Sequence, residues 1–173
     1  KRLARGRTDV TVELFTHSNF IQPSVIARVA GRGAHASKRV VIGAHEDSVA
    51  YRKDFPFPIE IPDAPGADDD ASGVATVLET FRVLMESGYQ PDHTLEFMTY
   101  AAEERGLLGS QDIAQNYKKN RIAVLGALQL DMTMYPGPDP ILHIINDNVD
   151  RGLTTFMQTL IDTYVKVRWV EMP

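Results

Sequence analysis

The 173-residue sequence contains no cysteine, which excludes disulfide bonds and thiolate metal ligands within it. It also lacks an apolar run of about 18 residues, the length that a membrane-spanning helix requires. It also lacks an excess of positive charge: the formal net charge is -5, and the basic residues form no broad face of the kind that binds nucleic acid. From these absences we expect neither a membrane nor a nucleic acid as partner.

The composition is that of an ordinary globular protein, with 43% apolar and 24% charged residues. A chain of this length fits one domain and can bury a sizeable core. The sequence shows no internal repeat and no domain boundary. We therefore predict a single domain over residues 1–173.

Hydrophobic periodicity divides the chain into strands and helices. Alternation of apolar and polar residues over 9–15 and 24–30 predicts an antiparallel hairpin, and the apolar run 39–44 predicts a strand buried on both faces. A long proline-rich loop is expected at 51–66. Further strands are expected at 94–101, 123–130, 141–145 and 165–170, and helices after Asp70, at 108–120 and at 149–164. This alternation predicts an α/β three-layer sandwich with a mixed, mainly parallel central sheet.

Four short stretches place a histidine or carboxylates at or just after the ends of apolar, strand-like runs. They are GAHEDS (43–48), PGADDDASG (65–73), YAAEERGLLGS (100–110) and LQLDMT (128–133). An open α/β sheet gathers its ligands at such positions, and one histidine with several carboxylates suits a divalent cation such as zinc. Taken singly, the histidine is more often structural, the acidic triplet a helix cap and the glutamate pair a solvated surface. Their occurrence together in one chain favours a metal site.

The motifs PGADDDASG, AAEERGLLGS and LQLDMT, in this order, resemble those of the zinc aminopeptidases of the M28 family, particularly the bacterial leucyl aminopeptidases. The similarity covers nearly all of the chain. It implies a zinc-peptidase-like fold, two zinc ions in a complete site, and hydrolysis that releases apolar residues from peptides with a free N-terminus. By the same resemblance the protein is expected to be secreted or periplasmic.

The resemblance also implies roles for individual residues. His45 and Asp131 correspond to ligands of one zinc ion. Asp69 corresponds to the carboxylate that bridges both ions, and Glu104 to a ligand of the other zinc. Glu103 corresponds to the general base, which must exchange a proton with water and the leaving amine and is therefore not a ligand.

Three further expectations depend on the same resemblance. The carboxylate of Asp47 is expected to accept the other imidazole N–H of His45 and so to fix the tautomer of the ring. Met132 and Ile145 are expected to line an apolar pocket for the first substrate side chain, with ordinary core packing as the alternative. The Asp69–Asp70 peptide bond is expected to be cis.

The chain departs from the family pattern at its end. The pattern continues with a cysteine-containing loop and a last histidine that binds the zinc on the Glu104 side, and the sequence stops at Pro173 before both. We therefore expect a fragment of a longer domain, incomplete at its C-terminal end, with little or no activity of its own. The remaining histidines are not expected to act as ligands: they are His17, His35, His93 and His143.

Two alternative functions remain open at this point. A glutaminyl cyclase shares the fold but works with one zinc, so it would not need both His45 and Asp131. The presence of both residues favours two metal ions. A non-catalytic binding or dimerisation module would retain the fold with degraded ligands, whereas here only the last histidine is absent.

Overall fold

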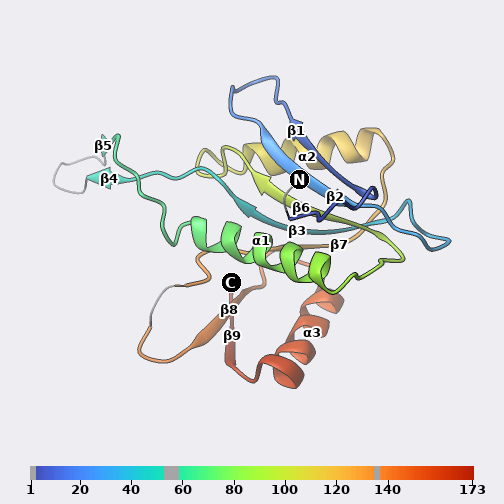
Figure 1. The fold of residues 1–173 in the computed structure, drawn as a ribbon. Coiled ribbons are helices and arrows are strands. Elements are labelled where there is room, and N and C mark those ends of the chain that lie inside the picture. Colours follow the sequence, from blue (N-terminus) through green and yellow to red (C-terminus); the bar gives the residue numbers. More distant parts are fainter. Residues whose placement is uncertain (1–2, 53–58, 135–136) are drawn as a thin grey trace. The chain divides into compact units, whose positions relative to one another are not determined.

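The computed structural model describes residues 3–52, 59–134 and 137–173 (Figure 1). The chain forms two compact units, Lys1–Met134 and Tyr135–Pro173. The first unit contains a five-stranded sheet with two helices, and the second contains a short parallel strand pair with one helix. The single domain expected over 1–173 stays a prediction.

The central sheet has the strand order β1-β2-β6-β3-β7. Its strands are β1 (Val10–Phe15), β2 (Ser24–Val29), β3 (Arg39–His45), β6 (Thr94–Tyr100) and β7 (Val124–Gln129), each within one residue of its predicted bounds. β3 pairs in parallel with both β6 and β7, whereas β2 pairs antiparallel with both β1 and β6. β2 therefore runs against the other four strands, and the predicted mixed, mainly parallel sheet is confirmed.

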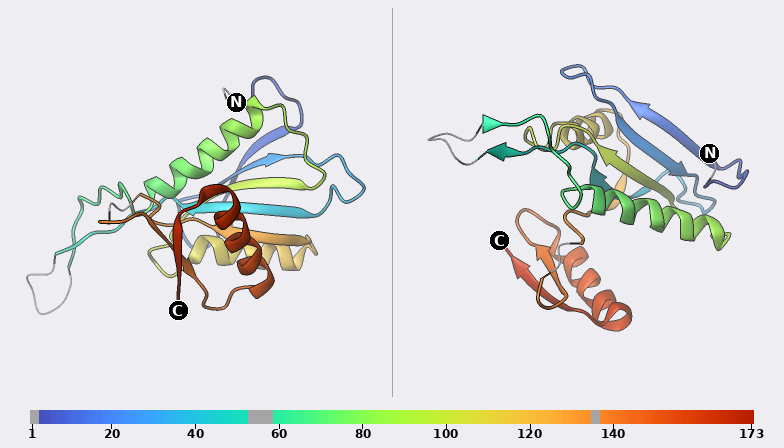
Figure 2. Two further views of the ribbon diagram at one scale, coloured as in Figure 1. Left: turned by 90° about the horizontal axis from the view of Figure 1, so that it is seen from below. Right: turned by 60° about the vertical axis from the view of Figure 1, so that its left-hand side comes forward.

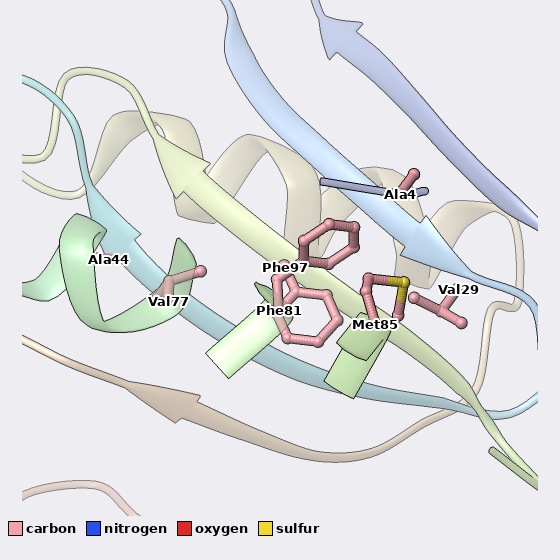
Figure 3. Packing of buried hydrophobic residues seen from close by; sticks show 7 residues of the cluster. All are labelled: Ala4, Val29, Ala44, Val77, Phe81, Met85 and Phe97. Atoms are coloured by element: carbon pink, nitrogen blue, oxygen red, sulfur yellow. The ribbon is translucent and has the colours of Figure 1, made fainter. Parts of the chain in front are cut away.

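Helix α1 (Ala71–Glu86) covers one face of this sheet. Its buried side chains Val77, Phe81 and Met85 recur every four residues, as expected for one face of a helix. They pack against Val29, Ala44 and Phe97 from three strands (Figure 3). The rings of Phe81 and Phe97 meet edge to face, with centroids 5.2 Å apart, a geometry that aromatic pairs prefer.

Helix α2 (Leu108–Lys119) covers the opposite face of the sheet (Figures 1 and 2). Its buried residues Ile113 and Tyr117 pack against Ile26, Val41 and Met98. The adjacent β6 residues Phe97 and Met98 thus face different helices, because successive strand side chains point to opposite faces. The two cores confirm the predicted three-layer α/β arrangement.

The second unit consists of β8 (Ile141–Ile145), α3 (Arg151–Leu160) and β9 (Arg168–Met172), with β8 and β9 paired in parallel. The helix predicted at 149–164 is shorter than expected, because a π-helical turn, Ile161–Val165, follows α3. Lys166 then adopts φ 57° and its N–H bonds to the carbonyl of Ile161, which ends the helical segment. For this reason β9 begins at Arg168 and not at 165.

The proline-rich segment predicted as a loop contains two short strands, β4 (Tyr51–Arg52) and β5 (Ile59–Glu60), which pair antiparallel. The part of that prediction over 53–58 lies outside the described residues. Among the helices that the structure describes, none is both long and apolar enough to cross a membrane.

Candidate metal-binding and catalytic site

Three neighbouring strands bring the predicted site residues to one edge of the central sheet. β3 ends at His45, and its parallel neighbours β6 and β7 end shortly before Glu103 and Asp131. Asp69 comes from the turn that precedes α1. Because parallel strands end at a common edge of the sheet, residues far apart in the sequence converge there.

His45 lies at the centre of this group, with 1% of its side chain exposed. Its Nε2 atom lies 2.9 Å from Oδ1 of Asp69 and 3.8 Å from Oδ2 of Asp131. One ligand atom from each of these residues falls within 4.8 Å of the others. Ligands bound at about 2.0–2.2 Å from one zinc ion must lie comparably close to each other. The three side chains therefore converge as expected, and they form a group that could bind a metal ion.

The imidazole of His45 is held in the orientation that a metal ligand needs. Its Nδ1 atom lies 2.9 Å from the main-chain oxygen of Asp47, to which it donates its N–H. In a neutral ring, this bond leaves the lone pair of Nε2 directed at the carboxylates of Asp69 and Asp131. The donor set, one imidazole with two carboxylates, fits zinc.

The role expected for the Asp47 carboxylate needs correction. Its Oδ1 atom lies 3.7 Å from the Nδ1 atom of His45, beyond hydrogen-bonding distance. The two carboxylate oxygens instead accept the main-chain N–H groups of Glu103, at 2.9 Å, and Glu104, at 3.1 Å. The main-chain carbonyl of Asp47 thus orients His45, while its side chain holds the glutamate pair.

Asp70 is buried and connects three segments around the site. Its Oδ2 atom accepts the N–H of His45 at 3.0 Å, and its Oδ1 atom accepts those of Gly73 at 2.9 Å and Met132 at 3.2 Å. The Asp69–Asp70 peptide bond is cis, as predicted. Sequence reasoning assigned only helix-cap chemistry to Asp70, because the bonds to His45 and Met132 depend on contacts that no local pattern reveals.

Two further residues hold the loop that follows β7, and sequence reasoning missed both. The hydroxyl of Ser72 accepts the N–H of Thr133 at 2.9 Å and donates to Asp68. Oδ1 of Asp68 also accepts the N–H of Met134 at 3.0 Å. Together with the bond to Asp70, three consecutive amides of this loop are therefore fixed to the start of α1.

Negative charge accumulates around the single histidine. Burial raises the pKa of Glu103 above its usual value, and the carboxylates of Asp131 and Glu104 raise it further. Burial likewise raises the pKa values of Asp131 and Glu104. For His45 burial acts to lower the pKa, but the surrounding carboxylates outweigh it and the net pKa is raised. A divalent cation would relieve the repulsion among these carboxylates.

The chain has recognisable relatives among known proteins. A family model described as "Peptidase family M28" matches residues 24–171, a span that includes every residue of the site. The chain belongs to this family. The resemblance seen in the sequence motifs is thereby confirmed.

This M28 chain is similar to proteins named as aminopeptidases. It is 43% identical over 171 residues to "Leucine aminopeptidase 1" of Aspergillus clavatus, which covers 93% of the chain and 42% of that protein. The "LapA aminopeptidase" of Legionella pneumophila matches with a TM-score of 0.80 and 31% identity, over 98% of this chain and 43% of that one. LapB of the same organism matches with a TM-score of 0.81 and 36% identity, over 99% and 44%. The M28 chain thus spans less than half the length of each of these relatives.

Glu104 stands apart from the three-donor group of the M28 chain. In the described part of the chain, the group of His45, Asp69 and Asp131 does not include it. Its carboxyl nevertheless lies close enough to Asp69 for the two charges to interact, which contributes to the raised pKa of Glu104. The four remaining histidines of the M28 chain also lie outside the group.

The two residues expected to form an apolar pocket lie in different units of the M28 chain. Met132 directly follows Asp131, has φ 45° and is 54% exposed. Ile145 ends β8 in the second unit and is 56% exposed. Neither is a core residue of its own unit, and a shared pocket stays a prediction.

Proposed function

We propose that the protein containing this chain is a zinc aminopeptidase, which hydrolyses the first peptide bond of peptides with a free N-terminus. The observation that carries this proposal is the group of His45, Asp69 and Asp131. Beside it, Oε2 of Glu103 lies 3.8 Å from Nε2 of His45. Such a site combines donors for a metal with a free carboxylate beside them. The names of the relatives, leucine aminopeptidase and LapA aminopeptidase, support it.

The proposed metal ligands divide between two zinc ions. His45, Asp69 and Asp131 would hold one ion, and Asp69 and Glu104 would contribute to a second. When bound, the ions polarise the scissile carbonyl and lower the pKa of water. Asp70 and the Asp47 carbonyl hold the main chain and the ring of His45, so this ligand needs little reorganisation to bind.

Glu103 is the general base in this proposal. Asp47 fixes its main-chain N–H, and its side chain, 23% exposed, places Oε2 3.8 Å from Nε2 of His45. As a carboxylate beside the metal donors and not one of them, Glu103 takes a proton from water. The protonated Glu103 then returns that proton to the leaving amine, which restores the carboxylate.

We also infer the class of substrate, for which the aminopeptidase names of the relatives are the support. A free α-amino group offers a basic nitrogen to the proposed site, and an acetylated N-terminus does not. For the first side chain we propose an apolar preference, with the exposed Met132 beside Asp131 as one contact. Location outside the cytoplasm stays a prediction.

The proposal is tested on the complete protein encoded by the gene. We expect it to contain two zinc ions by metal analysis and to release p-nitroaniline from leucine p-nitroanilide. A chelator should abolish this activity, and added zinc should restore it. The matched control is N-acetyl-leucine p-nitroanilide, which carries the same leaving group without a free amine and should not be cleaved.

Three results would contradict the proposal. Equal cleavage of the acetylated substrate would indicate a peptidase that does not recognise the free N-terminus. A single zinc with cyclisation of an N-terminal glutamine would favour the glutaminyl cyclase alternative. A folded protein with neither zinc nor turnover would favour a non-catalytic binding module.

A further inference from the structure

A closed network of hydrogen bonds, which we term the hydrogen-bond ring, supports the end of β6. Its members are His17, Ser24, Ala101, Gly109 and Asp112. His17 lies in the turn between β1 and β2, and its side chain is 0% exposed. Its Nδ1 atom lies 2.8 Å from Oδ2 of Asp112 in α2, and its Nε2 atom lies 2.9 Å from Oγ of Ser24 in β2. The same Ser24 oxygen accepts the main-chain N–H of Ala101 at 3.0 Å.

One set of hydrogen-bond directions satisfies every group of this network. Because Oγ of Ser24 accepts from Ala101, its own hydroxyl hydrogen can be donated to Nε2 of His17. In that set, Nδ1 of His17 carries a proton and donates it to the carboxylate of Asp112. Each donor has an acceptor in this arrangement, and successive bonds in one direction strengthen one another.

Helix α2 closes the ring. The N–H of Gly109 bonds to the carbonyl of Ala101 at 3.0 Å, and the same helix carries Asp112 one turn further on. The approach is so close that a Cβ atom at Gly109 would lie 2.2 Å from this carbonyl oxygen. Ala101 is thus held through its N–H by Ser24 and through its carbonyl by α2, and His17 joins the two supports.

The residue held in this way directly precedes the turn that carries the glutamate pair. Ala101 is followed by Ala102, which adopts φ 53°, and then by Glu103 and Glu104. On the far side of the turn, the Asp47 carboxylate accepts the two glutamate N–H groups. Within the turn, the N–H groups of Leu107 and Leu108 bond to the carbonyls of Glu103 and Ala102. The hydrogen-bond ring is the support before the turn.

We propose that His17 is a positioning residue for Glu103 and Glu104. By joining Ser24 to Asp112 it fixes the end of β6 relative to α2, and so fixes the turn between them. The inference rests on the proposed function, since it concerns the orientation of the proposed general base, Glu103, and of a proposed zinc ligand, Glu104. It assigns a use to a histidine that takes no part in the metal site.

The order Asp112, His17, Ser24 is also that of a nucleophilic triad, but burial excludes that use here. Ser24 is 0% exposed, and its hydroxyl is bonded to both His17 and the Ala101 amide. A nucleophile has to reach its substrate, and this oxygen is enclosed between β2, β6 and α2. The ring therefore acts as a support.

Asp112 is the member best suited to substitution, because its side chain is 41% exposed and its removal leaves no large cavity. Asp112→Ala opens the ring, whereas Asp112→Asn keeps an oxygen that accepts the Nδ1–H of His17. In the complete protein we expect Asp112→Ala to lower kcat about 10-fold and to change KM less than about 2-fold. The reason is that wrongly oriented catalytic groups slow the chemical step. Asp112→Asn should retain the wild-type kcat.

A second variant breaks the hydrogen-bond ring at its buried member, His17. The change His17→Phe keeps an aromatic side chain against Phe15 and Phe20, whose ring centroids lie 5.1 and 4.3 Å from that of the imidazole. It removes both hydrogen bonds, so we expect the same loss of kcat as in Asp112→Ala. Because both changes open one ring, the double variant should be no slower than the slower single variant.

Amide hydrogen exchange supplies a readout that needs neither zinc nor activity. The Ala101 N–H should exchange about 10-fold faster in Asp112→Ala and in His17→Phe than in the wild type, and remain unchanged in Asp112→Asn. Met85→Ala serves as the stability control, because Met85 lies in the core on the other face of the sheet. That variant should unfold more easily and keep its kcat.

An Ala101 amide that is equally protected in the ring-opening variants would overturn the proposal. So would a kcat in those variants that changes no more than in Met85→Ala, since His17 would then be only structural. A wild-type protein without peptidase activity would instead contradict the proposed function. The exchange comparison would still decide whether His17 fixes this turn.

Discussion

The two halves of the carboxylate cluster differ in how completely the described residues build them. In what we term the His45 half, His45 and Asp131 join Asp69 in a group whose ligand atoms lie within 4.8 Å of one another. In the Glu104 half, the described residues that we propose for the second zinc are Glu104 and the shared Asp69. A divalent ion needs three or more protein donors for firm binding at such sites, so the two halves are expected to behave differently.

The supports of the two halves also differ. The main chain of the His45 half is held by Asp70, which accepts the amides of both His45 and Met132. The glutamates of the other half are held by the Asp47 carboxylate. Each half thus has its own carboxylate that accepts main-chain amides, three at Asp70 and two at Asp47, and substitutions can disturb one half while sparing the other.

The largest effect is expected from Glu103→Gln, which alters the proposed base and leaves every proposed metal ligand in place. Turnover by the complete protein should fall about 10²–10⁴-fold, the usual cost of losing a general base. Zinc content, measured by atomic absorption, should equal that of the wild type. A loss of zinc would reassign Glu103 to the ligands and would remove the distinction between ligands and base.

The comparison of the two halves is tested most directly by zinc binding to the 173-residue chain. Calorimetric titration should show one tightly bound zinc ion, because the His45 half is the one group of three donors among the residues that the structure describes. His45→Ala should weaken that site by about 100-fold or more, since even the loss of a supporting residue costs 10–100-fold.

Glu104→Gln is the matched control for this titration. It changes a carboxylate in the other half and should leave the tight site within about 3-fold of the wild-type affinity. Two equivalent tight sites in the wild-type chain, or equal damage from the two substitutions, would show that the halves are not distinct.

A smaller effect is expected from Asp47→Asn, which acts on the Glu104 half. The amide keeps one oxygen as an acceptor but turns an NH2 group toward the second glutamate N–H, so one hydrogen bond is lost. We expect kcat of the complete protein to fall about 10-fold, as positioning of the base is disturbed. Zinc binding by the His45 half should be retained, because the main-chain carbonyl that orients His45 is unchanged.

The neighbouring Glu46→Gln provides the control for Asp47→Asn. Glu46 receives hydrogen bonds from Gln22 and Thr99 and makes none to the glutamate pair. Its substitution should leave kcat near the wild-type value. Equal losses in both variants would indicate a general effect of removing charge near the site.

The smallest effect is expected from Ser72→Ala, which acts on the His45 half alone. The change removes the hydroxyl that accepts the partly buried N–H of Thr133, so the free energy of unfolding should fall by about 0.5–1.5 kcal/mol. Urea denaturation measures this loss. Thr80→Ala, two turns further along α1, removes a hydroxyl that bonds only within the helix and should cost less than about 0.5 kcal/mol.

Much of the architecture could be predicted from local pattern. The alternation of 9–15 and 24–30 gave the hairpin of β1 and β2, and the apolar run at 39–44 gave β3. The extent of the second-unit helix was predicted less well, because its last turn is π-helical and apolar spacing does not distinguish that turn from a continuing α-helix.

The candidate site was predictable in its members but not in its contacts. His45, Asp69 and Asp131 were expected to converge, since ligands gather where strands of an α/β sheet end, and they do. The predicted acceptor of the His45 Nδ1–H, the Asp47 carboxylate, was wrong. Whether the carbonyl or the carboxylate of Asp47 accepts this N–H depends on where the Glu103 and Glu104 amides lie.

The sequence by itself determined which chemical groups stand at the ends of β3, β6 and β7, because strand period and the residues that follow each strand are local properties. Only the tertiary structure decided that Asp70 and Ser72 hold the loop after β7, and that His17 connects β2 to α2. Those bonds join segments distant along the chain, and a hydrogen bond requires its two atoms within about 3.2 Å. Such distances are set by the packing of both helices on the sheet, and no local pattern of residues contains that information.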